Sequence, residues 1–193
     1  MRKTLRHTSI ALAAAASMGA GMTFAAQAAQ HHRTVMVGGA AMYPSRNIVQ
    51  NAVNSRDHTT LVAAVQAAGL VDTLSGAGPF TVFAPTNTAF SALPAGTVDT
   101  LLRPENRGQL SAVLTYHVVA GRMTAADLMR AIRAGRGTAR LTTVQGGVLT
   151  ARMRGRSIVL TDGRGGTATV TQADVIQSNG VIHVTNAVSL PGA

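Results

Sequence analysis

Apolar residues recur at helical spacing through much of the first two thirds of the chain. In Thr59–Ala68, the residues Leu61, Val65 and Ala68 fall on one helical face, and Asp57 and Thr59 can cap the free amides at its start. The same pattern, together with proline and threonine at the starts, predicts helices over Asn47–Asn54, Pro94–Leu102, Pro104–Leu114 and Thr124–Ala134, the last closed by Gly135.

From Gly137 onward the hydrophobic period changes from about 3.6 to about 2, which marks a change from helices to strands. Predicted strands are Leu141–Val144, Val148–Met153, Ser157–Leu160, Ala168–Thr171 and Val181–Val184. Gly146-Gly147, Asp162-Gly163 and Asn179-Gly180 supply turns between several of them, so the pattern favours an antiparallel meander. Nearer the start, Gln30–Val37 is interpreted as a short tail or an edge strand.

Three shorter segments combine turn and strand signals. Phe80–Ala84 alternates as a half-buried strand, and Pro85-Thr86-Asn87 ends it and offers caps to a new helix. Asp174–Val184 indicates a hairpin, in which Asn179-Gly180 can adopt the positive φ angles of a type I′ turn. Between these segments, Tyr116-His117 lies in a predicted strand, Thr115–Val119, which places the two side chains on opposite faces.

In order and spacing, Gly78–Phe90, Tyr116-His117 and Asp174–Val184 resemble the two boxes and the central Tyr-His of the fasciclin (FAS1) domain family. The resemblance spans Met42 to Pro191 and assigns residues 42–193 to one such domain. It implies an α+β fold in which a β-sandwich or wedge of mostly antiparallel strands is flanked by several short helices. One departure is Thr88, which stands where the family's first box usually carries an acidic residue.

The resemblance also implies a secreted, non-enzymatic adhesion or matrix-binding module. Tyr116, His117, Asp174 and Val175 match positions proposed as receptor contacts in adhesive relatives, with Val175 in place of isoleucine. If Tyr116 and His117 are buried, their role is structural and other residues select the partner. The alternative function is an extracytoplasmic carrier of a small apolar ligand, which a sizeable apolar pocket would favour.

The first residues have the pattern of an export signal. Arg2, Lys3 and Arg6 precede an apolar run, and Ala26-Gln27-Ala28 offers small residues for cleavage, so residues 1–28 are interpreted as a cleaved signal peptide and 29–41 as a tail. No later run is long enough to span a membrane. We therefore expect a periplasmic or extracellular protein, stabilised without disulfides because the chain has no cysteine.

The formal charge of +10 is unevenly distributed. Between residues 130 and 164 only Asp162 opposes eight arginines: Arg130, Arg133, Arg136, Arg140, Arg152, Arg154, Arg156 and Arg164. They form either a solvated face or a docking surface for an acidic polysaccharide or anionic lipid, because guanidinium groups bind such anions through two hydrogen bonds. Nucleic acid is not an expected partner, since the chain is exported and has no Trp, two Tyr and four Phe.

Catalytic motifs are absent from the sequence. Glu105 is the single glutamate, and no nucleophile elbow, phosphate-binding glycine loop or His-Glu-x-x-His motif occurs. A hydrolase would need His117 or His183 beside a serine such as Ser178, so we expect no enzyme and no cofactor. Cleavage after Ala28 would make His31 the third residue of the new chain. The terminal amine, two backbone amides and the His31 imidazole could then bind Cu(II) or Ni(II). The alternative is an unstructured tail.

Overall fold

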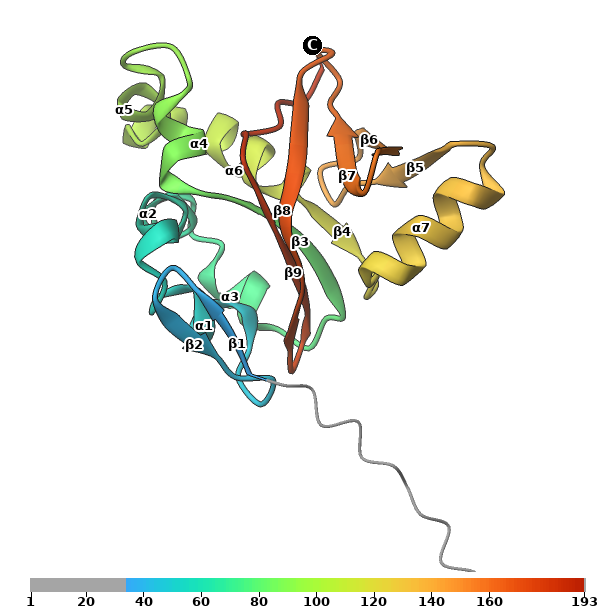
Figure 1. Cartoon of the computed structure of the whole chain (residues 1–193). Helices are drawn as coiled ribbons and strands as arrows, with labels where there is room; N and C mark the ends of the chain where they lie inside the picture. Colours follow the sequence, from blue (N-terminus) through green and yellow to red (C-terminus); the bar gives the residue numbers. More distant parts are fainter. Residues whose placement is uncertain (1–33, 193) are drawn as a thin grey trace, which may run out of the picture. The chain divides into compact units, whose positions relative to one another are not determined.

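The computed structural model describes residues 34–192. A two-stranded sheet precedes a seven-stranded sheet of order β4-β3-β9-β8-β7-β6-β5 (Figure 1). The strands are β1 (Val35–Val37), β2 (Ala40–Met42), β3 (Phe80–Pro85), β4 (Val118–Ala120), β5 (Thr138–Thr142), β6 (Val148–Arg154), β7 (Ser157–Thr161), β8 (Thr167–Gln177) and β9 (Gly180–Thr185). Consecutive strands from β5 to β9 pair antiparallel, so the predicted meander is confirmed.

Several short helices accompany the sheet, and two 3₁₀ helices, Arg56–His58 and Pro104–Asn106, precede α2 and α6. The α-helices are α1 (Ile48–Ala52), α2 (Thr59–Ala68), α3 (Val71–Ser75), α4 (Asn87–Ser91), α5 (Thr97–Leu101), α6 (Arg107–Tyr116) and α7 (Ala125–Ala134). As predicted, Thr86 caps α4, its hydroxyl oxygen accepting from the Ala89 amide. Thr88 of the same helix is exposed. The α+β class and the mostly antiparallel sheet are confirmed.

The seven-stranded sheet curls until its two outermost strands meet. Val119 of β4 forms an isolated antiparallel bridge with Thr143, just after β5, and the Val144 amide donates to the Val118 carbonyl at 2.7 Å. One parallel pair, β3 with β9, follows β4 directly in the strand order. The sheet is therefore a partly closed, barrel-like wall.

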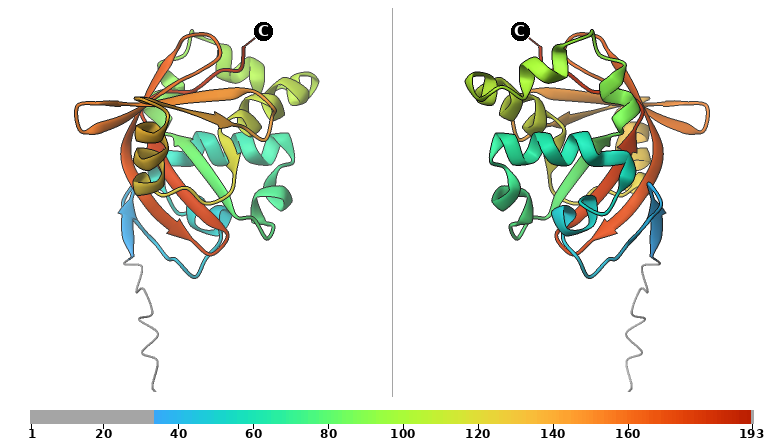
Figure 2. Two further views of the ribbon diagram at one scale, coloured as in Figure 1. Left: turned by 90° about the vertical axis from the view of Figure 1, so that its right-hand side faces the viewer. Right: turned by 90° about the vertical axis from the view of Figure 1, so that its left-hand side faces the viewer.

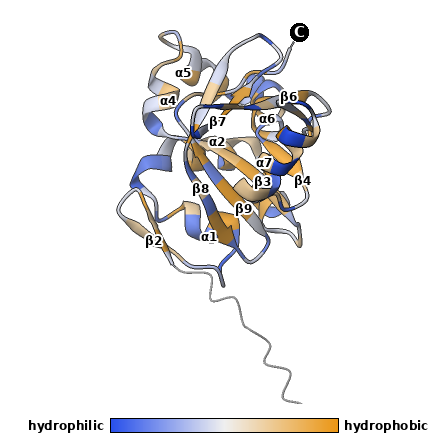
Figure 3. Cartoon of the chain, turned by 45° about the vertical axis from the view of Figure 1, so that its right-hand side comes forward, coloured by the Kyte–Doolittle hydropathy of each residue, from blue (hydrophilic) through white to orange (hydrophobic). Residues whose placement is uncertain are grey.

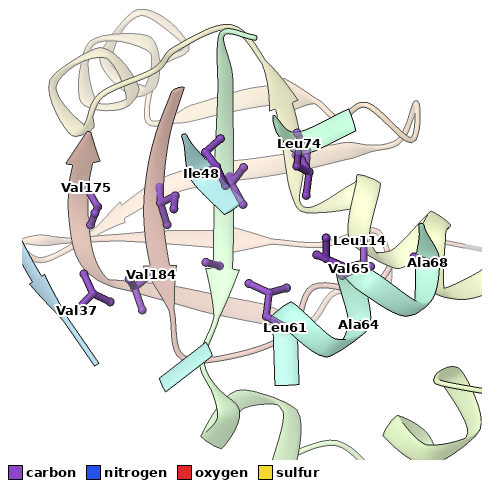
Figure 4. Close-up of a cluster of buried hydrophobic side chains, with 14 of the residues drawn as sticks. Val37, Ile48, Leu61, Ala64, Val65, Ala68, Leu74, Leu114, Val175 and Val184 are labelled. Atoms are coloured by element: carbon purple, nitrogen blue, oxygen red, sulfur yellow. The ribbon is translucent and has the colours of Figure 1, made fainter. Parts of the chain in front are cut away.

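Strands β3 and β9 separate two hydrophobic cores. Val82 and Ile182 face the first core, which the helices on one side of the wall cover, whereas Phe83 faces the second. The second core lies within the curled sheet and is closed by Leu128 and Ile132 of α7. Figure 1 shows α1, α2, α3 and α6 on one side of β3 and β9 and α7 on the other, and in Figure 3 the ribbon of β3 is mainly hydrophobic. Alternate side chains of the two central strands thus pack into the two different cores, the first of which is drawn in Figure 4.

The hairpin between β8 and β9 forms as predicted, but its turn differs. Gln177 pairs with Gly180, so the connecting residues are Ser178 and Asn179 rather than Asn179 and Gly180. Among residues 34–192, positive φ angles occur at other positions, and neither turn residue nor Gly180 adopts one, so the predicted type I′ geometry is wrong. The structure requires glycine at 180 because an added Cβ would lie 2.2 Å from the Phe80 carbonyl oxygen of β3.

The segment assigned as a tail is folded where the structure describes it. Val37 of β1 and Met42 of β2 are buried in the first core. The Gln172 side-chain amide of β8 also donates to the Met36 carbonyl at 3.0 Å. The edge-strand alternative for Gln30–Val37 therefore applies to Val35–Val37, and the domain includes residues before Met42. The predicted signal peptide, residues 1–28, lies outside the described residues.

Candidate functional site

Helix α7 carries the first arginines of the basic stretch. Thr124 and Asp127 form a capping box at its start, which satisfies amides that have no partner within the helix. Leu128 and Ile132 then face the second core, and Arg130 and Arg133 are exposed. The helix lies against one face of the β5–β6 layer (Figure 2).

Strands β5 and β6 place further arginines on the opposite face of this layer. Leu141, Leu149 and Ala151 face the second core, so the alternating residues Arg140, Arg152 and Arg154 project outward and are exposed. Arg140 is opposite Thr150, which makes Arg152 its diagonal neighbour at about 7–8 Å between the backbones. Alternation predicted this shared face correctly for Arg152 and Arg154.

Arg156 does not belong to that strand face. Arg154 pairs with Ser157, so Gly155 and Arg156 form the turn between β6 and β7, with Gly155 at a φ of 60°. Arg136 lies in the turn after α7, also in the left-handed region with a φ of 54°. Both turns lie at the same end of the layer, because the Thr138–Arg152 pair continues toward residues 136 and 154.

Seven of the eight arginines lie on α7, on the outer face of the β5–β6 layer and in the two turns at its end, and we call this set the basic tip: Arg130, Arg133, Arg136, Arg140, Arg152, Arg154 and Arg156. Arg164 follows β7, at the opposite end of that strand from Arg156, and its Nε donates to the Pro191 carbonyl at 2.9 Å. Within residues 34–192 the basic tip has one ion pair, between Arg130 and Asp127 at 3.1 Å. The other guanidinium groups of the tip are available to anions.

Tyr116 ends helix α6 instead of lying in a strand, so the predicted strand Thr115–Val119 is replaced by a helix end and the short strand β4. Its ring is buried in the second core. Its hydroxyl group donates to the Val148 carbonyl at 2.7 Å and accepts from the Gly163 amide at 2.8 Å. Burial raises the pKa of this phenol. Tyr116 thus joins the end of α6 to the start of β6 and to the loop after β7.

His117 and Val175 are also buried, and both line the first core. The His117 Nδ1 contacts the Val113 carbonyl at 2.8 Å, and its Nε2 accepts from the Ser189 amide at 2.9 Å. Asp174, half-buried in a bulge of β8, has a φ of 59°, and its carboxylate accepts from the Ala125 amide at the start of α7 at 2.7 Å. In this structure the residues that match proposed receptor contacts pack against or hydrogen-bond to other parts of the domain. Their binding to a partner stays a prediction.

The pairing of His117 or His183 with Ser178, considered above for a hydrolase, is not formed. His183 stacks on Phe83, its Nε2 contacts the Met123 carbonyl at 2.8 Å, and its Nδ1 accepts from the Asp174 amide at 3.3 Å. Since both nitrogens of His117 are engaged as well, neither imidazole has a nitrogen free to activate Ser178. The geometry gives no support to the hydrolase alternative.

Acid is expected to destabilise the fold through its buried imidazoles. Burial lowers the pKa of His58, His117 and His183 below the ordinary value of 6.5. Below about pH 6.5 the unfolded chain therefore binds more protons than the folded one, and the free energy of unfolding falls by at most about 1.4 kcal/mol per pH unit for each titrating histidine. Urea unfolding between about pH 7.5 and about pH 5 measures this slope; a flat profile would contradict it.

An apolar cavity of about 90 Å³ lies in the first core. Ligand pockets for drug-sized molecules are about 300–1,000 Å³, so this cavity does not favour a carrier of such ligands. Across residues 34–192, no helix has the length and apolarity required to cross a bilayer. The same residues contain no cluster of three potential metal ligands. His31, the predicted copper or nickel ligand, lies outside the described residues.

The architecture defines the class of the protein as a small α+β domain with a curled, mostly antiparallel sheet, one helix-covered wall and an arginine-rich end. The family model described as "Fasciclin domain" matches residues 56–191. The chain belongs to the fasciclin domain family, as the three sequence segments predicted.

The chain is also similar to individual proteins. The chain is 45% identical to "Protein sll1483" of Synechocystis sp. over 159 residues, which cover 82% of this chain and 81% of the relative. It is 38% identical to "Immunogenic protein MPB70" of Mycobacterium bovis over 147 residues, covering 74% and 67% of the two chains. Among solved structures, a FAS1 domain pair from the insect cell adhesion molecule Fasciclin I matches with a TM-score of 0.47 and 23% identity, over 73% of this chain and 43% of that one.

Proposed function

We propose that this protein is an exported, non-enzymatic binding module of the adhesion type, which docks on acidic polysaccharide through the basic tip. Membership of the fasciclin domain family supports the adhesion role. The observation that carries the docking mechanism is the basic tip itself, to which α7, β5, β6 and two turns contribute seven exposed arginines. Among the described residues, one of these arginines is in an ion pair, Arg130 with Asp127. Planar guanidinium groups bind carboxylate and sulfate through two parallel hydrogen bonds, so the tip suits an acidic glycan.

Changing Arg152, Arg154 and Arg156 together to serine is expected to weaken binding to an acidic polysaccharide about ten- to hundredfold at low salt. Each arginine near an anionic surface contributes about 1 kcal/mol, and added salt screens that contribution. Binding of the processed wild type should therefore fade as salt rises, and the variant should lose part of this salt dependence, since four arginines of the basic tip remain. Sedimentation or biolayer interferometry against an acidic and a neutral polysaccharide measures both effects.

A matched control removes the same charge elsewhere. Arg46, Arg56 and Arg103 are exposed and lie outside the basic tip, so their replacement by serine changes the net charge equally. Binding retained by this control but lost by the first variant supports docking at the tip. Equal loss of binding in both variants would show that binding responds to net charge alone and would overturn its assignment to the basic tip. Anionic vesicles form a second arm, and binding to vesicles but not to polysaccharide would assign the tip to lipid surfaces instead.

A further inference from the structure

The arginines of the basic tip lie on two faces that point in opposite directions. On one side, helix α7 packs Leu128 and Ile132 into the second core. Arg130 is two positions away from each of them, which is about 160–200° around a helix, so it projects away from the core. Its side chain is 73% exposed, and Arg133, about one turn further on, is exposed as well. We call Arg130 and Arg133 the helix face.

The second face is the outer surface of β5 and β6, and we call its arginines, Arg140, Arg152 and Arg154, the strand face. Threonines stand opposite two of them across the strand pair, Thr150 opposite Arg140 and Thr138 opposite Arg152. These small side chains leave the guanidinium groups uncovered, and their hydroxyl groups can hydrogen-bond to those of a sugar. The strand face therefore suits a polymer that carries both acidic groups and hydroxyl groups.

Acidic side chains oppose these arginines at one position. The sequence has no aspartate or glutamate from residue 128 to residue 161, a stretch that includes β5, β6 and β7. On the helix face Asp127 pairs with Arg130 at 3.1 Å. An exposed ion pair of this kind is weak, so an acidic group of a polymer can replace Asp127 as the partner of Arg130. Both faces are thus able to bind an anionic strand.

Helix α7 and the second core lie between the two faces (Figure 2). A helix with its side chains is about 10–12 Å across, so the two sets of guanidinium groups are more than about 10 Å apart. At physiological ionic strength, attraction between charges is largely screened beyond about 8 Å. A strand bound to one face therefore interacts little with the other. To reach both, a single strand would have to turn back around the tip, which repulsion between its own charges disfavours.

We propose that the basic tip binds two strands of acidic polysaccharide at once, one on the helix face and one on the strand face, so that a single domain bridges separate strands. This inference rests on the proposed function and adds that the domain cross-links the polymer. Bridging requires no second copy of the chain, because both faces belong to one domain. Each contact is weak by itself, and many domains along the same two strands together hold them in a stable junction.

A sandwich assay with alginate, a polyuronate, tests the bridging. One preparation of alginate is immobilised, the processed protein is bound to it at low salt, and unbound protein is washed away. A second, fluorescently labelled preparation is then added. We expect the protein-coated surface to retain the labelled alginate but not labelled dextran, which is neutral. Retention should fall as salt rises, since both contacts are electrostatic.

Two variants remove two charges each, one variant for each face. Arg130→Ser with Arg133→Ser removes the helix face, and Arg140→Ser with Arg152→Ser removes most of the strand face. All four side chains are exposed, so both variants are expected to fold. Each should still bind the immobilised alginate through its intact face, but should retain about tenfold less labelled alginate per molecule of bound protein.

A matched control, Arg46→Ser with Arg56→Ser, loses the same charge outside the basic tip and should retain labelled alginate as the wild type does. Wild-type protein that binds immobilised alginate but retains no labelled alginate would overturn the bridging and leave the proposed function intact. Retention at the wild-type level by both face variants would also overturn it, because paired copies or net charge would then explain the bridging. If the wild type does not bind the immobilised alginate, the proposed function fails, and the bridging fails with it.

Discussion

Replacing Gly180 with valine is expected to destabilise the domain by about 3 kcal/mol or more, enough to unfold a large fraction of the protein. A Cβ at this position would lie 2.2 Å from the Phe80 carbonyl oxygen and 3.0 Å from the Phe80 amide nitrogen. These are backbone atoms of β3, which pairs in parallel with β9 and whose Phe80 amide donates to the Asn179 carbonyl. The strand cannot move aside without breaking the wall between the two cores.

Gly108→Ala is the control for the Gly180 variant. Gly108 lies in α6, no atom lies within 4 Å of an added Cβ, and its φ is not in the left-handed region. Alanine there should leave stability unchanged or raise it by up to about 1 kcal/mol, because glycine is the weaker helix former. Urea unfolding followed by circular dichroism compares the two variants. A Gly180→Val protein with the unfolding midpoint of the wild type would refute the close approach of β9 to β3.

Asn179→Ala is expected to cost about 3 kcal/mol or more of unfolding free energy. The buried Asn179 side chain accepts from the Ile48 amide at 3.0 Å and donates to the Leu74 and Gly76 carbonyls at 2.8 and 2.9 Å. Its removal leaves three backbone groups without this partner, and each buried unsatisfied group costs about 1–3 kcal/mol. One side chain in the β8–β9 turn therefore holds the start of α1 and the end of α3.

Two neighbouring changes test this assignment by the same unfolding measurement. Ser178→Ala alters the other turn residue, which is exposed, and should change stability by no more than about 0.5 kcal/mol. Asn179→Asp keeps an acceptor for Ile48 but loses both donors, so a carboxylate would face two carbonyl oxygens. It should destabilise at least as much as alanine. A mild effect of Asn179→Asp together with a severe effect of Asn179→Ala would show that the Ile48 contact dominates.

Local signals predicted most helices and most strands because the causes of these elements are local, whereas helix α3 was not predicted. The Thr124 cap, the periodicity of Thr59–Ala68 and the alternation around Arg152 are each complete within a few residues. The turn geometry at Asn179 was mispredicted because its partners lie more than 100 residues away in the chain. A rule based on the φ preferences of Asn-Gly cannot include such contacts.

Tyr116 shows a second limit of local reasoning. The run from Thr115 to Val119 has the residue types of a strand, yet α6 continues to Tyr116. The side chain then bonds to Val148 at the start of β6 and to Gly163 in the loop after β7, both more than 30 residues further along the chain. For the candidate site, the exposure of the arginines was foreseeable, but the separation of Arg164 from the basic tip required the strand pairing. Sequence patterns gave no indication of the cavity in the first core.

The junction of β4 with β5 bears on how copies of this domain behave when many are held together at a surface. A free strand edge can recruit the edge of another molecule and start a fibril, and proteins reduce this risk by joining or covering such edges. Here the Val119–Thr143 bridge joins the two outermost strands of the large sheet at one point. The large sheet therefore offers crowded neighbours little free strand edge to pair with.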